Sequence, residues 1–421
     1  MGSNWKNIPL GNLITLQRGH DLPSQDRTEG CVPIMGSSGL TGWHNEVKMT
    51  GPGVVVGRSG NSMGVVSYSD SDFWPLNTCL YVTDFKGNDV RYIYYLLQQI
   101  DFDQFNSGSA QKSLNRNAVY PFEVYSTEDK DEQRAIAKLL SDFEEKVALN
   151  NQINQTLEQM AQTLFKSWFV DFDPVKAKMN GEQPKGMDAA TASLFPEKLV
   201  ESELGLIPEG WEASKLEDLV DIASSKRVFA KEYLKEGVPF YRGKEITELS
   251  KGNSVTPEIY ISEERYQELK DKAGAPKKGD ILITSVGTIG NTYLVDLEDK
   301  FYFKDGNLTW VRGYKGEEIP YFLMEWFNSA VGKCAVENIK IGSTQQAITI
   351  KSLNGIKLVS PPNDIHMKFT QLIEPLYRKH RANIKQSKAL ANLRDTLLPK
   401  LLSGEIDLEN VQVKEVKAIV E

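Results

Sequence analysis

Two stretches of the chain carry apolar residues three and four positions apart, which is the pattern of a helix with one buried face. The first extends from Asp131 to about Phe169 and contains no proline or glycine. The second begins near Ile365, and seven of its apolar residues stand at one constant offset from those of the first. The pattern therefore predicts two related long helices, at 131–170 and 364–404. The matched pairs are Ile136 and Phe369, Leu139 and Leu372, Leu140 and Ile373, Phe143 and Leu376, Leu157 and Leu390, Met160 and Leu393, and Leu164 and Leu397.

The length of these helices restricts how they can be buried. A helix of roughly 37 residues is ~55 Å long, which is too long for its apolar stripe to pack on one compact core. We expect the two helices to pack against each other as a coiled coil. The segment 171–210 between them is rich in proline, glycine and alanine and is predicted as a linker. A second globular part at the far end of the first helix would make the pair antiparallel and the molecule pseudo-twofold symmetric.

The segments outside the helices are also repeated. Trp5 to Leu16 matches Trp211 to Ile222 at a constant offset, with an aromatic residue followed by leucines at the same spacing. Gly53 to Val66 parallels Gly279 to Val295, since each has a β-branched run, a loop of serine and glycine, and a second apolar run. Such a pattern is typical of two strands joined as a hairpin.

Two further matches follow in the same order. Phe73 to Val82 resembles Phe301 to Val311, with Asn77 opposite Asn307. Ser107 to Asn115 parallels Ile341 to Thr349, which aligns Gln111 with Gln345 and Gly108 with Gly342. The sequence therefore predicts an α+β fold with two repeated domains, each built on a mainly antiparallel sheet and separated by the two long helices. The expected order is domain 1 (1–130), helix (131–170), linker (171–210), domain 2 (211–363), helix (364–404) and a C-terminal tail (405–421).

Two similar domains held apart by a helical rod suit a protein that contacts two DNA half-sites about one turn, ~34 Å, apart. Because the domains share a frame but differ in their loops, we expect the two half-sites to differ. The loops carry arginine, lysine, amide and hydroxyl groups that can pair with base edges or phosphates. The candidate DNA-binding residues of the first half are Arg58, Ser59, Asn61, Ser62, Ser109, Gln111, Lys112, Asn115 and Arg116. Those of the second half are Lys226, Arg227, Arg242, Lys244, Ser285, Thr288, Lys340, Ser343, Thr344, Gln345 and Gln346.

Composition is consistent with a globular protein of two or three domains. The 421 residues are 40% hydrophobic and 25% charged, and no segment is apolar enough to cross a membrane. The first ten residues lack the features of a secretory signal, so we expect a cytoplasmic protein. A net charge of −8 is unfavourable for DNA binding as a whole, but a basic surface can exist on an acidic protein.

Cysteine and histidine residues give no sign of a metal site. Cys31, Cys79 and Cys334 are far apart and form no CxxC pair, so all three are predicted as buried reduced thiols. The four histidines show no zinc-binding spacing. His20 and His44 lie in polar, loop-like contexts and are expected to be exposed or hydrogen-bonded. The other two histidines are His366 and His380.

Three segments resemble catalytic motifs, and each also has a structural interpretation. Ser360 to Asn363 resembles the motif with which amino-methyltransferases hold a base, but asparagine replaces the stacking aromatic residue and no glycine-rich cofactor loop accompanies it. Gly237 to Lys244 departs from a phosphate-binding loop in spacing, and Glu245 follows where serine or threonine should bind magnesium. The two prolines of the first segment are better explained as breaking the chain before the second long helix, and ATP binding at the second segment is not expected.

The third pattern is a nuclease site, in which Asp280 and Glu298 would hold magnesium and Lys300 would orient water. The equivalent place in the first half has no carboxylate, which favours a solvated turn. A structural coiled-coil adaptor is the remaining alternative. An adaptor would have no need of arginine, asparagine and glutamine in matching loops of both domains, so we expect a DNA-binding protein without a catalytic site.

Three segments resemble the specificity subunit of type I restriction-modification systems. They are Leu164 to Lys178 (LFKSWFVDFDPVKAK), Gly186 to Trp211 (GMDAATASLFPEKLVESELGLIPEGW) and Leu393 to Ile406 (LRDTLLPKLLSGEI). The resemblance covers nearly the whole chain. It implies two target recognition domains alternating with two long helices, and sequence-specific binding of double-stranded DNA.

The resemblance also implies partners. Subunits of this family bind two modification subunits, which use S-adenosylmethionine to methylate adenine, and through them restriction subunits, which use ATP and Mg²⁺. No cofactor is then expected in this chain. The family's long helices form much of the docking surface. The leucines expected in the coiled coil or at the partner interface are Leu157, Leu164, Leu390, Leu397 and Leu401.

Overall fold

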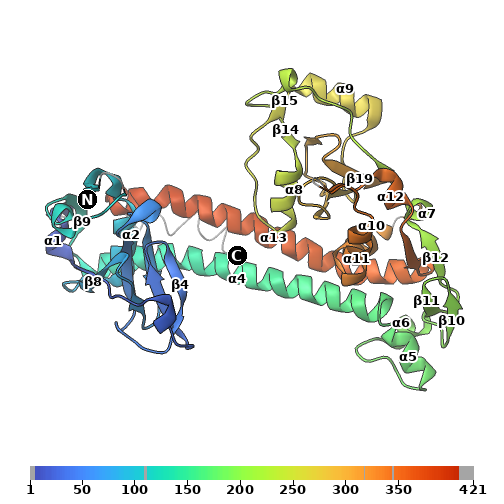
Figure 1. The fold of residues 1–421 in the computed structure, drawn as a ribbon, viewed down its shortest axis with the longest axis horizontal. Coiled ribbons are helices and arrows are strands. Elements are labelled where there is room, and N and C mark those ends of the chain that lie inside the picture. Colours follow the sequence, from blue (N-terminus) through green and yellow to red (C-terminus); the bar gives the residue numbers. More distant parts are fainter. Residues whose placement is uncertain (1–4, 109–110, 317, 344–345, 407–421) are drawn as a thin grey trace. The chain divides into compact units, whose positions relative to one another are not determined.

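The computed structural model describes residues 5–108, 111–316, 318–343 and 346–406 (Figure 1). The chain forms two compact units: unit 1 is Met1–Leu149 with Gln386–Glu421, and unit 2 is Asn150–Lys385. Each unit contains one globular domain and a part of both long helices. These helices are α4 (Lys130–Phe169) and α13 (Asn363–Leu402), with 40 residues each.

The globular domain of unit 1 is built on a four-stranded antiparallel sheet in the order β2-β8-β5-β6. A second sheet has the order β4-β3-β7, in which β3 and β7 are parallel, and β1 pairs with β9. The strands are β1 (Trp5–Pro9), β2 (Thr15–Arg18), β3 (Val32–Gly36), β4 (Gly39–His44), β5 (Gly53–Gly57), β6 (Val66–Ser69), β7 (Trp74–Pro75), β8 (Cys79–Asp84) and β9 (Glu123–Thr127). The helices are α1 (Leu10–Leu13), α2 (Val90–Gln98) and α3 (Arg116–Val119), with 3-10 turns η1 (Ser24–Asp26), η2 (Gly60–Ser62) and η3 (Phe102–Phe105).

The globular domain of unit 2 repeats this plan. Its four-stranded antiparallel sheet has the order β13-β19-β16-β17, its second sheet is β15-β14-β18 with β14 and β18 parallel, and β12 pairs with β20. The strands are β12 (Glu212–Lys215), β13 (Asp221–Ala223), β14 (Val238–Tyr241), β15 (Tyr260–Ile261), β16 (Ile281–Thr284), β17 (Thr292–Leu294), β18 (Tyr302–Phe303), β19 (Leu308–Arg312) and β20 (Lys357–Ser360). The helices are α7 (Leu216–Leu219), α8 (Gly243–Ser250), α9 (Glu263–Ala273), α10 (Ile319–Asn328), α11 (Ala330–Asn338), α12 (Ile350–Asn354) and the 3-10 turn η4 (Ala230–Glu232).

The two domains therefore share one topology, since each has the same three sheets with equivalent strand orders. This confirms the predicted repeat and the mainly antiparallel α+β class. The hairpins predicted from the sequence are β5 with β6 and β16 with β17. Domain 2 differs mainly by α8 and α9, which stand between strands of its second sheet.

The two long helices pack antiparallel within each unit. In unit 1, the early part of α4 shares a core with the late part of α13, through Ile136 and Phe143 on one side and Leu390 and Leu397 on the other. In unit 2 the opposite parts of the two helices are in contact. Residues of the late part of α4 and the early part of α13 share that core, and they include Phe165, Phe169, Phe369 and Ile373.

Not every predicted seam position is buried. Met160 is 51% exposed and Leu372 is 42% exposed, whereas Ala161, Phe165 and Trp168 fill the core of unit 2. A helix has 3.6 residues per turn, so a stripe of alternating threes and fours drifts around its surface. The residues that are buried in this unit therefore lie beside the predicted positions on the helix surface.

A buried polar cluster interrupts the apolar contact between the helices in unit 2. The side-chain amide of Asn383 donates to Oδ1 of Asn154 at 2.8 Å, and that of Asn154 donates to the backbone carbonyl of His380 at 3.3 Å. Asn383 and Asn150 are also buried. A buried amide is stabilised only where its partner is opposite, so these contacts favour one register of the helix pair.

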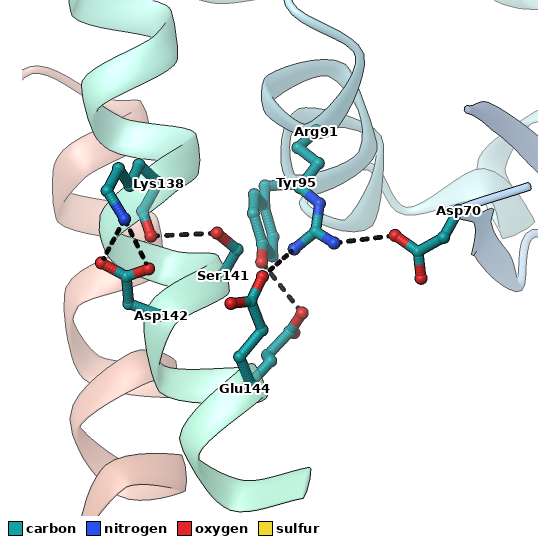
Figure 2. Close-up of polar contacts among 8 residues, drawn as sticks. Asp70, Arg91, Tyr95, Lys138, Ser141, Asp142 and Glu144 are labelled. Carbon is teal, nitrogen blue, oxygen red and sulfur yellow. Dashed lines mark hydrogen bonds and ion pairs between the residues drawn. The ribbon is translucent and has the colours of Figure 1, made fainter. Parts of the chain in front are cut away.

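The globular domain of unit 1 is attached to α4 by polar contacts of α2. Figure 2 shows the Tyr95 hydroxyl donating to Glu144 of α4 at 2.9 Å. Arg91 reaches Glu145 of α4 at 3.3 Å and also pairs with Asp70 of its own domain at 2.8 Å. Burial and the Glu144 carboxylate raise the pKa of Tyr95, so the hydroxyl stays a donor. On α4 itself, Lys138 pairs with Asp142 at 2.9 Å.

The segment 171–210, predicted as a linker, is folded. It forms α5 (Asp173–Met179), α6 (Ala189–Ser193) and a hairpin of β10 (Leu199–Ser202) and β11 (Gly205–Pro208). Val175 and Phe195 are fully buried in the core of unit 2, and the ring of Phe195 lies 5.0 Å from that of Trp168. Burial of these side chains gives the segment a core despite its proline and glycine content.

The prediction that all three cysteines are buried is wrong for two of them. Cys79 is buried, but Cys31 and Cys334 are exposed, because Cys31 lies in a turn before β3 and Cys334 on the outer side of α11. His44 is buried at the end of β4 and is hydrogen-bonded, which is one of the two predicted roles, because its Nδ1 accepts from the backbone N–H of Thr28 at 3.1 Å. Within the described residues, no helix is long and apolar enough to cross a membrane.

One buried carboxyl joins α10 to α13. The Tyr377 hydroxyl donates to Oε1 of Glu325 at 2.6 Å, and among the described residues Oε2 has no hydrogen-bond partner. Glu325 is only 4% exposed. Burial raises the pKa of Glu325 to about 7, since a charge there is poorly solvated.

This raised pKa predicts a stability that depends on pH. Between the ordinary pKa of a glutamate and about 7, the folded chain holds a proton that the unfolded chain has lost, so stability falls as pH rises through this range. We expect a contribution of about 3 kcal/mol below pH 5 to be lost above pH 7. The free energy of unfolding of unit 2, measured in urea at several pH values, checks this.

The variant Glu325→Gln should flatten that pH dependence. Glu337→Gln, at an exposed glutamate of the neighbouring helix α11, should leave it unchanged. Equal pH slopes for the wild type and Glu325→Gln would contradict the burial of an uncharged carboxyl here.

Candidate nucleic-acid interface

In each domain, several loops leave the same end of the four-stranded sheet. In unit 1 this end lies after β2 and β5 and before β6 and β8, and in unit 2 after β13 and β16 and before β17 and β19. Neighbouring strands of these sheets are antiparallel, so the end of one strand adjoins the start of the next. We call this place the loop end of the domain.

Backbone hydrogen bonds hold the loops of domain 1 together. The N–H of Arg58 donates to the carbonyl of Thr78 at 2.9 Å, and the N–H of Leu114 donates to the carbonyl of Arg58 at 2.8 Å. The N–H of Gly60 donates to Lys112 at 3.0 Å. The loops 58–62 and 111–116, which are far apart in the sequence, are therefore side by side.

Domain 2 contains the same two bonds at equivalent positions. The N–H of Ser285 donates to the carbonyl of Asn307 at 2.8 Å, and the N–H of Ile348 donates to the carbonyl of Ser285 at 3.0 Å. Thr78 thus corresponds to Asn307, one residue away from the predicted match with Asn77. The difference arises because the segment before β19 is one residue longer than its counterpart before β8.

The predicted residues of domain 1 lie at or beside the loop end. Asn61 and Gln111 are exposed, and Ser59 and Ser62 are half-buried. The remaining predicted residues have intramolecular partners: Nη1 of Arg58 donates to the carbonyl of Asn77 at 3.4 Å, Nη1 of Arg116 donates to Leu16 at 3.0 Å, Lys112 pairs with Asp103 at 2.6 Å, and Asn115 caps α3. Ser109 lies outside the described residues.

The predicted residues of domain 2 divide into accessible and buried ones. Thr288, Ser343 and Gln346 are exposed, and Lys340 pairs with Glu337 at 2.5 Å. Ser285 is 3% exposed, and its hydroxyl lies 2.6 Å from that of Thr309. This burial makes Ser285 a structural residue of the loop in this structure, in contrast to the prediction. Thr344 and Gln345 lie outside the described residues.

The second sheet of domain 2 also ends here, because the N–H of Lys304 donates to the carbonyl of Tyr241 at 2.9 Å. Arg242 and Lys244 follow directly. Both contact Glu258, at 2.8 and 2.6 Å, and Arg242 also contacts Glu245 at 2.8 Å. These two cations hold the pKa of Glu258 at about 2, so their charge is largely compensated within the domain.

Two side-chain pairs at the loop ends were not recognised as pairs from the sequence. In domain 1, Nδ2 of Asn77 donates to Oδ1 of Asp21. In domain 2, Nε of Arg227 donates to Oδ2 of Asp305 at 3.1 Å. Arg227 was among the predicted residues, whereas the other three were not. In the sequence, these residues are recognisable as polar residues. Two of them follow the first strand of the four-stranded sheet (β2 or β13), and the other two precede the strand that pairs with it (β8 or β19).

The leucines predicted for the coiled coil or a partner interface occupy different environments. Leu390 and Leu401 are fully buried and Leu397 is 6% exposed, and all three are in the core of unit 1. Leu157 and Leu164 are half-buried in unit 2. The first three therefore serve the packing of the unit, since they offer almost no surface to another protein.

The residues of the nuclease alternative do not converge. Asp280 is buried and accepts a hydrogen bond from Nε1 of Trp310 at 2.8 Å, Glu298 pairs with Lys385, and Lys300 pairs with Glu263 at 2.8 Å. Within the part of the chain that the structure describes, no group of three or more His, Cys, Asp or Glu residues could hold a metal ion.

Comparisons with known proteins agree with this architecture. The specificity subunit of the type I restriction enzyme HindI of Haemophilus influenzae is 26% identical over 399 residues, covering 83% of this chain and 85% of that protein. The MjaIX specificity subunit of Methanocaldococcus jannaschii is 27% identical over 327 residues, covering 76% of this chain and 70% of that protein. The type I restriction-modification S subunit from M. genitalium shares the fold, with a TM-score of 0.63 at 20% identity and coverage of 94% and 96%.

A model of one family covers both repeats. It is described as the type I restriction modification DNA specificity domain, and it matches residues 2–159 and 208–391. Each match includes a globular domain and a large part of the long helix that follows it. The chain therefore belongs to the DNA specificity family of type I restriction-modification systems.

Proposed function

We propose that this chain recognises an asymmetric, bipartite DNA sequence, with one half bound at the loop end of each domain. The observation that supports this most directly is the pair of backbone hydrogen bonds found at equivalent positions in both domains, at Arg58 and at Ser285. The side chains on this shared frame differ. A constant frame with variable side chains suits two surfaces that bind duplex DNA similarly but recognise different bases.

The chain itself acts by positioning. We propose that it docks two adenine methyltransferase subunits, and through them restriction subunits, and that S-adenosylmethionine, ATP and Mg²⁺ bind to those partners. A methyltransferase must take its target base out of the helix, so DNA fixed by two recognition domains presents the flanking adenines to it. Because the substrate is chromosomal DNA, we expect the assembly in the cytoplasm.

Exposed apolar residues on the long helices support docking of a protein partner. Met160 of α4 is 51% exposed, and Met367 and Leu372 of α13 are 39% and 42% exposed. All three belong to unit 2 and stand outside its core. Apolar residues on the outer faces of two packed helices are more easily explained by a partner than by solvent.

Methylation mapping tests the proposal. Genomic DNA from cells that express the chain with its modification subunit should carry one bipartite methylated motif, and either protein alone should give none. Exchange of residues 1–130 for those of a relative should change only one half of the motif, and exchange of 211–363 only the other. Methylation by the chain alone would contradict a non-catalytic role. A stable complex that methylates no motif would favour a structural adaptor.

A second prediction concerns the loop frame of domain 1. A Cβ atom on Gly57, at the end of β5, would stand 1.9 Å from the carbonyl oxygen of Ser62 and 2.4 Å from that of Ser37. Both obstacles are backbone atoms, so Gly57→Ala must displace the loop 58–62. We expect the assembled complex to bind its target DNA about tenfold or more weakly, as for a mismatched site.

Gly355→Ala provides the control, because its Cβ would meet the nearest atoms at 3.8 Å, an ordinary contact. Binding of labelled duplex DNA by the two variant complexes, followed by fluorescence anisotropy, gives the comparison. Wild-type affinity of the Gly57→Ala complex would exclude the loop 58–62 from the interface.

A further inference from the structure

The two side-chain pairs at the loop ends occupy the same place in the repeated fold. Leu16 of β2 pairs with Val82, and Ile222 of β13 pairs with Val311, so these positions correspond. Asp21 and Arg227 each follow five residues later. Their partners Asn77 and Asp305 stand just before β8 and β19.

The backbone beside each pair is held rigidly. In domain 1, the N–H of His20 donates to Pro75 at 2.8 Å and the N–H of Asn77 donates to His20 at 2.9 Å. In domain 2, the N–H of Lys226 donates to the Tyr302 hydroxyl at 3.0 Å, and the buried Ser225 hydroxyl donates to Phe303 at 2.7 Å. Both pairs therefore project from fixed backbone, which base recognition requires.

Within each pair, the two side chains are exposed to different degrees. The Arg227 side chain is 70% exposed, whereas Asp305 is 21% exposed. The arginine is therefore the accessible member and the aspartate its support. In domain 1 the exposure is reversed, since Asn77 is half-buried and Asp21 is 74% exposed, and Arg18 approaches the Asp21 carboxylate at 3.9 Å. There the choice of Asn77 depends on its chemistry, because an amide both donates and accepts whereas a carboxylate only accepts.

The free donors and acceptors of these side chains match particular bases. With Nε of Arg227 occupied by Asp305, its two Nη groups remain to donate side by side, as O6 and N7 of guanine require. With one Nδ2 hydrogen of Asn77 on Asp21, its second N–H and its Oδ1 fit N7 and N6 of adenine. Among the hydrogen bonds between described residues, Oδ1 of Asn77 accepts none.

We propose that Asn77 and Arg227, which are opposite members of the two corresponding pairs, are base-reading residues of the two recognition domains, Asn77 for an adenine and Arg227 for a guanine in the major groove. Asp21 and Asp305 are their positioning residues. This inference rests on the proposed function, because it assumes that the loop ends face DNA. It assigns to each half of the target one base and the residue that selects it.

The test is selection from a randomised duplex DNA library by the full chain assembled with its modification subunits. Arg227→Gln should reduce the preference for one guanine in one half of the motif by about tenfold to a hundredfold. Asn77→Ala should reduce the preference for one adenine in the other half to a similar degree. All other positions of the motif should keep their wild-type preferences.

Matched variants separate base reading from general effects. Arg134→Gln changes an exposed arginine of α4 that also pairs with an aspartate, and Asn392→Ala changes an exposed asparagine of α13, so both should keep the full motif. Asp305→Asn should weaken the same guanine preference while binding to unrelated DNA is retained. Thermal unfolding of Arg227→Gln, Arg134→Gln and Asn392→Ala should match the wild type, because these three side chains are exposed.

The possible outcomes distinguish this inference from the proposed function. If the wild-type assembly selects no motif, the proposed function itself fails. If it selects a motif but Arg227→Gln weakens binding to every sequence equally and lowers the salt dependence, Arg227 contacts a phosphate and the inference is wrong. Unchanged preferences in Arg227→Gln and Asn77→Ala, or changes at other bases, would also overturn it.

Discussion

Each compact unit depends on apolar contact between the two long helices. The core of unit 1 includes Ile136 and Phe143 of α4 together with Leu390 and Leu397 of α13, which are separated from them by more than half of the chain. The core of unit 2 is completed in the same way by Phe165 and Phe369. Unit 1 therefore joins two separate stretches of the sequence, and each globular domain stands on a core that both helices help to form. Buried amides such as Asn154 and Asn383 make one register of the pair the most favourable.

On this support, the two domains repeat one backbone arrangement and vary its side chains. The carbonyl groups of Arg58 and Ser285 accept equivalent hydrogen bonds, whereas the exposed residues nearby differ in charge and shape. Within domain 2, Glu245 and Glu258 neutralise the two cations Arg242 and Lys244, which stand near the loops. Such internal pairing, together with a net charge of −8, limits nonspecific attraction to DNA, so binding depends more on the fit of individual groups.

The sequence was sufficient to predict the features that come from repetition and periodicity. The two long helices, the hairpins and the repeated order of segments all follow from local patterns that tertiary packing does not change. The resemblance to type I specificity subunits, stated from three segments, is confirmed by the family match. Which loop residues contact DNA remains a prediction.

Features that depend on distant contacts could not be predicted in this way. Val175 and Phe195 stand in a segment whose composition indicates a linker, but the aromatic end of α4 provides a core for them. Ser285 stands in a segment that has the composition of an exposed loop. It is nevertheless buried, because Thr309 lies opposite its side chain. The pairs Asp21 with Asn77 and Arg227 with Asp305 join residues more than fifty positions apart, so only the strand register brings them together.

Hydrogen–deuterium exchange of the assembled complex, with and without duplex DNA that carries its methylated motif, tests the central claim most directly. The account predicts that DNA slows exchange at the loop ends of both domains, in residues 19–22, 58–62 and 76–78 and in residues 224–228, 285–291 and 304–307. Slowed exchange confined to the opposite ends of the same sheets, with the loop ends unaffected, would contradict it.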